Sequence, residues 1–256
     1  MPHPYLSHDA RPRVIAHRGL VTAQLAAQGA AENTFAAMTA AVEAGARYLE
    51  SDCRLTSDGE VVLLHDVDLA RVCGDPRPVT AVSSRELASL FADRGGLLTL
   101  GEALEVFPEA RFNIDIKSRE VAEPAGSIIA PHAERVLVTS FADGHRRAAL
   151  QAITSASGSG ARPATSPGRG ALIRTLAALA TGQRKAAARV LGGFDALQIP
   201  EKYGRVRVLT PRLIDFAESV GVEVHVWTVN DPAEMERLTD MGVRGIITDR
   251  ADLALG

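Results

Sequence analysis

Charged side chains recur at every second position in two separate segments of the chain. Glu50 and Asp52 lie in the segment RYLESD, and Asp115 and Lys117 lie in RFNIDIK. Side chains two residues apart in a strand lie on one face of the sheet. Two buried carboxylates on one face repel each other and are costly to desolvate unless a cation or a base is present. A divalent metal would resolve this conflict, whereas the simpler interpretation is a strand end whose acids are solvated.

Two histidines follow apolar segments in a similar way. His17 ends the segment RVIAH and is followed by Arg18, and His65 follows EVVLL. A neutral imidazole is a natural proton carrier near pH 7. A single histidine on an apolar strand is more often a packed core residue, but two of them beside three acids favour acid–base catalysis. His225 alternates with apolar residues in VEVHVW, and we expect it to be structural.

These side chains suit one type of chemistry if they share a site. Oxygen ligands alone, from Glu50, Asp52 and Asp115, favour Mg²⁺ or Ca²⁺ over zinc. Arg18 could hold a phosphate through two parallel hydrogen bonds, and Lys117 could hold it as a point charge. A hard cation, two basic side chains and two histidines together predict chemistry on a phosphate ester.

The elements that would position these residues follow an alternating order. Apolar segments predict strands, and most of them are separated by helical patterns, which favours an α/β fold with a parallel sheet. Eight strand–helix units in about 250 residues are typical of a (β/α)8 TIM barrel, whose active sites lie at the carboxyl ends of the strands. The predicted strands are 13–17, 47–52, 60–66, 111–117, 135–141, 161–166, 196–200, 222–229 and 244–249, and the predicted helices are 32–45, 99–107, 172–191, 210–221 and 231–242.

The predicted strands number nine, one more than the barrel needs. We therefore assign 60–66 to a small insertion after the second strand, at about 53–98, and expect a single domain over 1–256. This insertion contains turn-like segments and the loop CGDPRPV.

Composition excludes several classes of function. The net charge of -3 and an aromatic content of 4% argue against a nucleic-acid partner. Only two cysteines are present, so a disulfide framework is not expected. No stretch approaches the length of an apolar membrane span, and the first residues lack the apolar core of a signal peptide. We therefore expect a cytoplasmic protein with no stable membrane insertion and a small-molecule substrate.

Taken in order, the motifs resemble those of the glycerophosphodiester phosphodiesterase family. The matching segments are AHRG, ENT, YLESDCRLTSDGEVVLLHD, FNIDIK, TSF, VWTVN and GIITDRAD, and they extend from about 14 to 253. The resemblance implies a (β/α)8 barrel with a small insertion after its second strand. It also implies metal-dependent hydrolysis of glycerophosphodiesters to glycerol 3-phosphate and an alcohol.

The same resemblance implies a role for individual residues. Glu50, Asp52 and Asp115 would bind the metal, either Mg²⁺ or Ca²⁺. His17 and His65 would form the acid–base pair, Arg18 and Lys117 would bind phosphate, and Phe141 and Trp227 would line the substrate pocket. Asn33 of ENT would support the site. The leaving alcohol, the oligomeric state and the choice between direct attack by water and a cyclic phosphate intermediate stay open.

Three features depart from the family pattern. The third metal position is Asp115, where the family more often has a glutamate with one more methylene group. The segment 20–31 is longer than usual, and we expect it to act as a lid or to reshape the leaving-group pocket. The link from Lys117 to Ser140 looks short, which predicts a reduced helix there.

Two alternatives to this function stand beside it. One is a related lysophospholipase D-type barrel enzyme that acts on lysolipids. The other is a catalytically silent barrel that serves as a binding scaffold, since a fold alone does not establish chemistry. Substitution of either histidine would abolish turnover in an enzyme and would change nothing in a scaffold.

Overall fold

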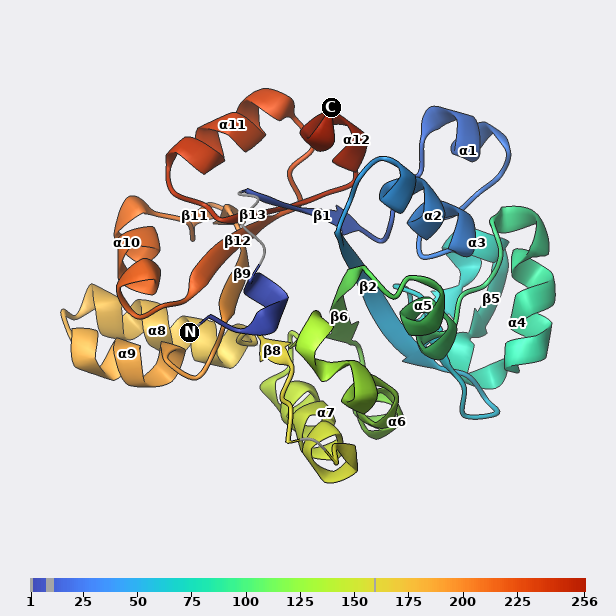
Figure 1. The fold of residues 1–256 in the computed structure, drawn as a ribbon, viewed down its shortest axis with the longest axis horizontal. Coiled ribbons are helices and arrows are strands. Elements are labelled where there is room, and N and C mark those ends of the chain that lie inside the picture. Colours follow the sequence, from blue (N-terminus) through green and yellow to red (C-terminus); the bar gives the residue numbers. More distant parts are fainter. Residues whose placement is uncertain (1, 8–11, 159) are drawn as a thin grey trace.

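Parallel strands surround a common axis in the computed structural model, which describes residues 2–7, 12–158 and 160–256 (Figure 1). Within these residues eight strands form a nearly closed barrel in the order β8-β7-β6-β2-β1-β13-β12-β9. The prediction of a (β/α)8 barrel is therefore confirmed. The strands are β1 (Arg13–His17), β2 (Tyr48–Leu55), β6 (Arg111–Ile116), β7 (Val136–Thr139), β8 (Ala164–Thr165), β9 (Ala196–Pro200), β12 (Glu223–Trp227) and β13 (Gly245–Thr248).

The ring closes between its shortest strand, β8, and β9. Here the backbone N–H of Asp195 donates to the carbonyl of Thr165 at 2.9 Å. The backbone N–H of Gln198 donates to the hydroxyl of Ser166 at 3.1 Å. A side chain thus replaces part of the strand ladder, because β8 is only two residues long.

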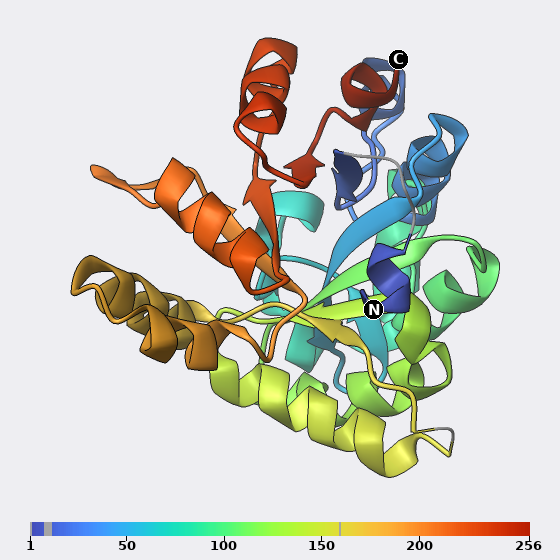
Figure 2. The same cartoon turned by 60° about the vertical axis from the view of Figure 1, so that its left-hand side comes forward.

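Helices cover the outside of the strands (Figures 1 and 2). Apolar strand residues pack outward against these helices, and alternate side chains point into the barrel, as the twofold periodicity of a strand requires. None of the described helices has the length and apolar content needed to cross a bilayer. The helices are α1 (Ala23–Ala27), α2 (Phe35–Glu43), α5 (Leu100–Val106), α6 (Arg119–Ile129), α7 (Asp143–Ala156), α8 (Arg169–Ala180), α9 (Arg184–Leu191), α10 (Pro211–Ser219), α11 (Pro232–Asp240) and α12 (Ala251–Leu255), with a 3-10 turn η4 at Ala130–Arg135.

The segment after β2 forms a small separate unit, as predicted. β2 continues to Leu55 and pairs antiparallel with β3 (Val61–Leu63). The unit has its own apolar cluster, centred on Leu87 and Phe91. Its further elements are β4 (Asp68–Leu69), α3 (Ala70–Cys73), β5 (Asp75–Pro78), η2 (Val79–Ala81), α4 (Ser84–Phe91) and η3 (Ala92–Arg94).

The amino-terminal end of the barrel is closed by the turn η1 (Pro4–Leu6). Tyr5 is fully buried there and packs edge-to-face on Tyr48. The guanidinium of Arg13, at the start of β1, donates to the Glu223 carboxylate at 2.8 Å and to the Tyr48 hydroxyl at 3.0 Å. The opposite, carboxyl end of the strands is left open for a site.

Several sequence predictions about individual elements are wrong. The helix predicted over 172–191 is two helices, α8 and α9, which are separated where Gly182 adopts a positive φ of 76°. The helix between Lys117 and Ser140 is not reduced, since α6 has 11 residues. The strand predicted at 161–166 is limited to β8. A short hairpin, β10 (Lys202–Tyr203) with β11 (Val206–Arg207), had no sequence prediction.

Gly126 allows α6 to pack closely on α7. An added Cβ at this position would lie 2.6 Å from the Ala149 carbonyl oxygen and 2.7 Å from the Ala152 Cβ. We expect Gly126→Ala to lower the free energy of unfolding by about 1–3 kcal/mol through overpacking, measured by urea denaturation. The matched control is Gly101→Ala in α5, where an added Cβ meets nothing within 4 Å. The control should stabilise the protein by up to about 1 kcal/mol, and equal effects of both changes would contradict the close-packing argument.

Candidate active site

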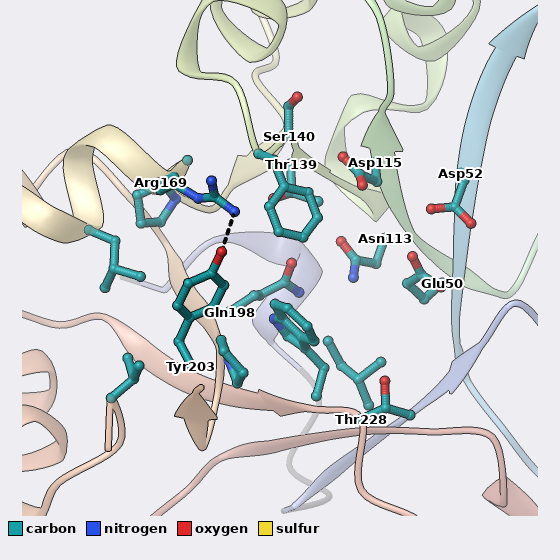
Figure 3. Close-up of a pocket in the computed structure, with 18 of the residues that line it drawn as sticks. Glu50, Asp52, Asn113, Asp115, Thr139, Ser140, Arg169, Gln198, Tyr203 and Thr228 are labelled. Atoms are coloured by element: carbon teal, nitrogen blue, oxygen red, sulfur yellow. Dashed lines mark hydrogen bonds between the residues drawn. The ribbon is translucent and has the colours of Figure 1, made fainter. Parts of the chain in front are cut away.

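The register of three neighbouring strands brings the predicted site residues together. In the parallel ladder His17 of β1 pairs with Glu50 of β2. Glu50 in turn pairs with Asn113 of β6, and Asp52 pairs with Asp115. Figure 3 shows the last four of these side chains, which reach one cavity from adjacent strands. The prediction that alternate polar residues share the inner face of the barrel is confirmed.

A cavity of about 440 Å³ opens at the carboxyl ends of the strands. All nine predicted site residues line it. Its polar end holds His17, Arg18, Glu50, Asp52, His65, Asn113, Asp115 and Lys117. Its other end is mostly apolar and is formed by Phe141, Pro167, Leu172, Ile173, Leu176, Pro200, Tyr203, Val206, Val208 and Trp227.

Lys117 links two of the three carboxylates. Its Nζ lies 2.6 Å from Asp52 Oδ1 and 2.7 Å from Asp115 Oδ2. Burial opposes ionisation of Asp52, but Lys117 and Arg18 outweigh it and lower the pKa of Asp52. Burial raises the pKa of Asp115, although Lys117 counteracts it. Burial lowers the pKa of Lys117, but the two aspartates outweigh this effect and raise it.

The third carboxylate, Glu50, is less well neutralised. Burial, and next the negative charge of Asp52, raise its pKa to about 8. Its nearest basic side chain is His17, whose Nε2 lies 3.8 Å from Glu50 Oε2. The backbone N–H of Arg18 also donates to this carboxylate, at 3.1 Å. The polar end of the cavity therefore carries more buried acid than its cations neutralise.

The chemistry of the three carboxylates fits a hard divalent cation. They supply oxygen ligands only, and the buried Asp115 Oδ1 has no hydrogen-bond partner in the described residues. No three histidine, cysteine, aspartate or glutamate side chains among residues 2–7, 12–158 and 160–256 are already arranged around a metal position. The Lys117 ammonium group lies between Asp52 and Asp115 and neutralises part of their charge.

His17 is held by a carboxylate from the far end of the chain. Its Nδ1 lies 2.6 Å from Asp249 Oδ1, and Asp249 Oδ2 accepts from Asn230 Nδ2 at 2.8 Å. Burial would lower the pKa of His17, but the bond to Asp249 and the charge of Glu50 outweigh it and raise the pKa. The contact leaves Nε2 facing the carboxylate cluster, so the ring is oriented for proton transfer there.

His65 has an equivalent partner in the insertion. Its Nδ1 lies 2.8 Å from Asp66 Oδ1, and Asp66 Oδ2 accepts from Arg71 Nε at 2.6 Å. Arg71 also donates to Glu32 at 2.6 Å, and Glu32 accepts from Arg18 at 2.8 Å. One chain of ion pairs thus joins the insertion, the second histidine and the phosphate-binding arginine candidate.

Backbone strain marks two residues beside the carboxylates. Arg18 and Asn33 are the two non-glycine residues with positive φ in the described part of the chain, at 59° and 61°. Asn33 accepts from the Ser51 hydroxyl at 2.7 Å and donates to Asp52 at 3.3 Å. Such backbone conformations cost about 1–3 kcal/mol each and persist where the surroundings hold them. Asn33 therefore supports the orientation of Asp52, as its predicted role requires.

Two aromatic rings of the apolar end pack against each other, and one of them lies near Lys117. Phe141 and Trp227 meet edge-to-face, with ring centroids 5.8 Å apart. The Lys117 ammonium lies 5.8 Å from the centre of the Phe141 ring. These two predicted pocket residues thus line the wall where a substrate would pass from the charged cluster to the apolar side.

Sequence reasoning missed most of the partners that hold the histidines. Asp249 and Asp66 stand at strand ends, which was a usable signal, but no role was predicted for them. Arg71 and Glu32 had no such signal, because they meet across 39 positions of sequence. The long segment 20–31 contributes no residue to the cavity wall. It instead contacts the insertion, where the Ala31 N–H donates to the Arg94 carbonyl.

Comparisons with known proteins all identify similarity to glycerophosphodiester phosphodiesterases. The model of the glycerophosphoryl diester phosphodiesterase family matches residues 17–253. The probable glycerophosphodiester phosphodiesterase 2 of Mycobacterium tuberculosis is 38% identical over 97% of this chain and 91% of its own. The crystal structure of glycerophosphodiester phosphodiesterase from Thermotoga maritima is 27% identical, with a TM-score of 0.69 over 97% of this chain and 99% of that one.

A more distant structure has the same fold. It is an Oleispira antarctica phosphodiesterase in complex with the product sn-glycerol-3-phosphate, 20% identical with a TM-score of 0.68 over 94% of each chain. The family match extends over nearly the whole chain and covers both histidines and all three carboxylates. This chain therefore belongs to the glycerophosphoryl diester phosphodiesterase family and is a phosphodiesterase.

Proposed function

We propose that this enzyme hydrolyses glycerophosphodiesters to glycerol 3-phosphate and an alcohol, with a divalent cation, Mg²⁺ or Ca²⁺, held by Glu50, Asp52 and Asp115. The observation that carries the proposal is the incompletely neutralised group of three buried carboxylates beside two basic side chains and two histidines. The product bound by the Oleispira antarctica enzyme supports the substrate class. When bound, a divalent cation would polarise the phosphoryl oxygens and stabilise negative charge.

The side chains of this enzyme would share the remaining steps. Arg18 and Lys117 bind the phosphate oxygens, and both now pair with carboxylates that a cation would take over. His17, whose contact with Asp249 favours the protonated ring, donates a proton to the leaving alkoxide oxygen. His65 accepts a proton from the attacking hydroxyl, which belongs either to water or to the glycerol moiety. Phe141 and Trp227 line the adjoining wall.

The direct test is release of glycerol 3-phosphate from glycerophosphocholine and glycerophosphoethanolamine. We expect release to stop with EDTA and to return when Mg²⁺ or Ca²⁺ is added. His17→Ala and His65→Ala should each lower kcat by about 10²–10⁴-fold. His145→Ala, on α7 and outside the cavity, is the matched control and should keep full activity. Metal-independent release, or full activity of either histidine variant, would contradict the corresponding part of the proposal. No release by the unaltered protein would favour a silent scaffold.

Asp249 should be a positioning residue for His17. We expect Asp249→Asn to lower kcat by about 10²–10⁴-fold with a much smaller change in KM, because the ring loses the anion that fixes its orientation and charge. Asp252→Asn is the control, since Asp252 pairs with Arg250 on the surface near the same strand end. Equal kinetics of the two variants would show that the Asp249 contact has no part in turnover.

The apolar end of the cavity favours a second candidate, a lysophospholipase D-type reaction. Leu172 and Leu176 of α8 face the cavity together with Val208, so an aliphatic chain could lie along this wall while the phosphodiester reaches Lys117. Deacylated glycerophosphodiesters have no group that would gain from burial there. Each methylene group placed on such a wall would contribute up to about 0.8 kcal/mol.

Paired substrates separate the two candidates. We expect the Leu172→Ser/Leu176→Ser variant to raise KM for lysophosphatidylcholine at least about ten-fold while changing KM for glycerophosphocholine little. Both KM values are measured on the same sample, so a smaller amount of folded protein does not change their ratio. No choline release from lysophosphatidylcholine by the unaltered enzyme would exclude the second candidate and leave the first one standing.

We also propose that the enzyme works in the cytoplasm. Its cysteines, Cys53 and Cys73, are both free thiols, which suits a reducing compartment. Fractionation of the source cells should recover activity from cytoplasm and inner membrane face, and recovery outside the cell would contradict this location.

A further inference from the structure

The β10–β11 hairpin stands at the mouth of the cavity. It lies between the end of β9 and the start of α10, and so belongs to the carboxyl end of the barrel. Tyr203 pairs with Val206 across its turn, where Gly204 has a positive φ of 59°. In Figure 2 this segment projects away from the barrel beside α10. A surface that binds at this end of the barrel would therefore contact the side chains of the hairpin.

Exposed apolar side chains gather at this mouth. Val206 is 66% exposed and Tyr203 is 63% exposed, more than any other large apolar side chain in the described residues. Ile173 of α8 and Phe141 are also more than half exposed, and all four residues line the same cavity. Apolar side chains scattered singly over a surface need no explanation, but a cluster at one opening indicates a binding surface.

Positive charge accompanies these apolar groups. Lys202, Arg205 and Arg207 of the hairpin are exposed, and none of them forms an ion pair within 4.0 Å in the described part of the chain. Arg169 adds a fourth cation, because its guanidinium lies 5.4 Å over the Tyr203 ring and donates to the Tyr203 hydroxyl (Figure 3). The chain as a whole has a net charge of -3. The hairpin, residues 202–207, is therefore locally opposite in sign to the molecule.

We propose that the hairpin docks the enzyme onto a lipid surface that carries anionic head groups. Tyrosine and valine would enter the interface, and the lysine and arginines would contact the head groups, which is the pattern of an interfacial anchor. Charge complementarity favours an anionic surface. Tyr203 and Val206 of the hairpin line the same cavity as Leu172, Leu176 and Val208, so a phosphodiester with one aliphatic chain could pass from the lipid surface to the site. Binding does not require hydrolysis and can be tested without a substrate.

Vesicle co-sedimentation tests the proposal. We expect the unaltered enzyme to sediment with vesicles of phosphatidylglycerol and phosphatidylcholine, to bind pure phosphatidylcholine vesicles weakly, and to dissociate at high salt. Arg205→Ser/Arg207→Ser should weaken partitioning about five-fold for each charge removed while leaving hydrolysis of soluble glycerophosphocholine unchanged, because neither side chain lines the cavity. Retained hydrolysis also shows that this variant folds.

A matched pair of variants tests the location of the anchor. Val206→Ser/Arg205→Ser should lose about 50-fold in partitioning, whereas Val106→Ser/Arg85→Ser, with the same changes on α5 and α4, should bind like the unaltered enzyme. Equal loss in both pairs, or no sedimentation with any vesicle, would overturn the proposal. Concentration-dependent dimerisation that only the hairpin variant abolishes, in an enzyme that does not bind vesicles, would assign the surface to a second copy of the chain instead.

Discussion

Neutralisation of buried carboxylates is the constraint on which the site depends. Three acids on two adjacent strands cannot stay ionised in a barrel interior unless cations compensate them. Lys117 compensates Asp52 and Asp115, whereas Glu50 keeps a pKa of about 8. A divalent cation would neutralise the negative charge that remains uncompensated. Asp115 fits this view, because its short side chain satisfies Lys117 with one oxygen and leaves the other buried without a partner.

The two histidines depend on the same electrostatic balance but are held by different parts of the fold. His17 belongs to the barrel and is fixed by Asp249 at the end of the last strand, 232 positions away. His65 belongs to the insertion and is fixed by its neighbour Asp66, which Arg71 holds in place. Arg71 and Glu32 then tie the insertion to Arg18. The insertion therefore supplies one of the two histidines that line the cavity, and its ion pairs reach Arg18.

Sequence periodicity predicted the elements that bury alternate residues, and this was enough to place the carboxylates, Lys117 and both histidines at one end of a barrel. It failed where long-range contacts decide the outcome. The break between α8 and α9 is an exception, because it comes from the local backbone at Gly182, which has a positive φ of 76°. α6 reaches 11 residues and packs closely on α7 at Gly126. The contacts of Asp249 and Arg71 arise only when the barrel closes. The β10–β11 hairpin has two-residue strands, too short to show any periodicity.

The cavity has a charged inner end and a mostly apolar mouth, and this division limits which substrates can bind in it. Its inner end is lined by Arg18 and Lys117, which would pair with a charged phosphodiester. Its mouth is lined by Phe141, Ile173 and Tyr203, whose side chains are all more than half exposed. A wall of exposed apolar side chains lowers solubility and is tolerated where something covers it. If the hairpin docks on a lipid surface as proposed, an amphiphilic phosphodiester would place its head group at the charged end of the cavity and its chain along the apolar wall.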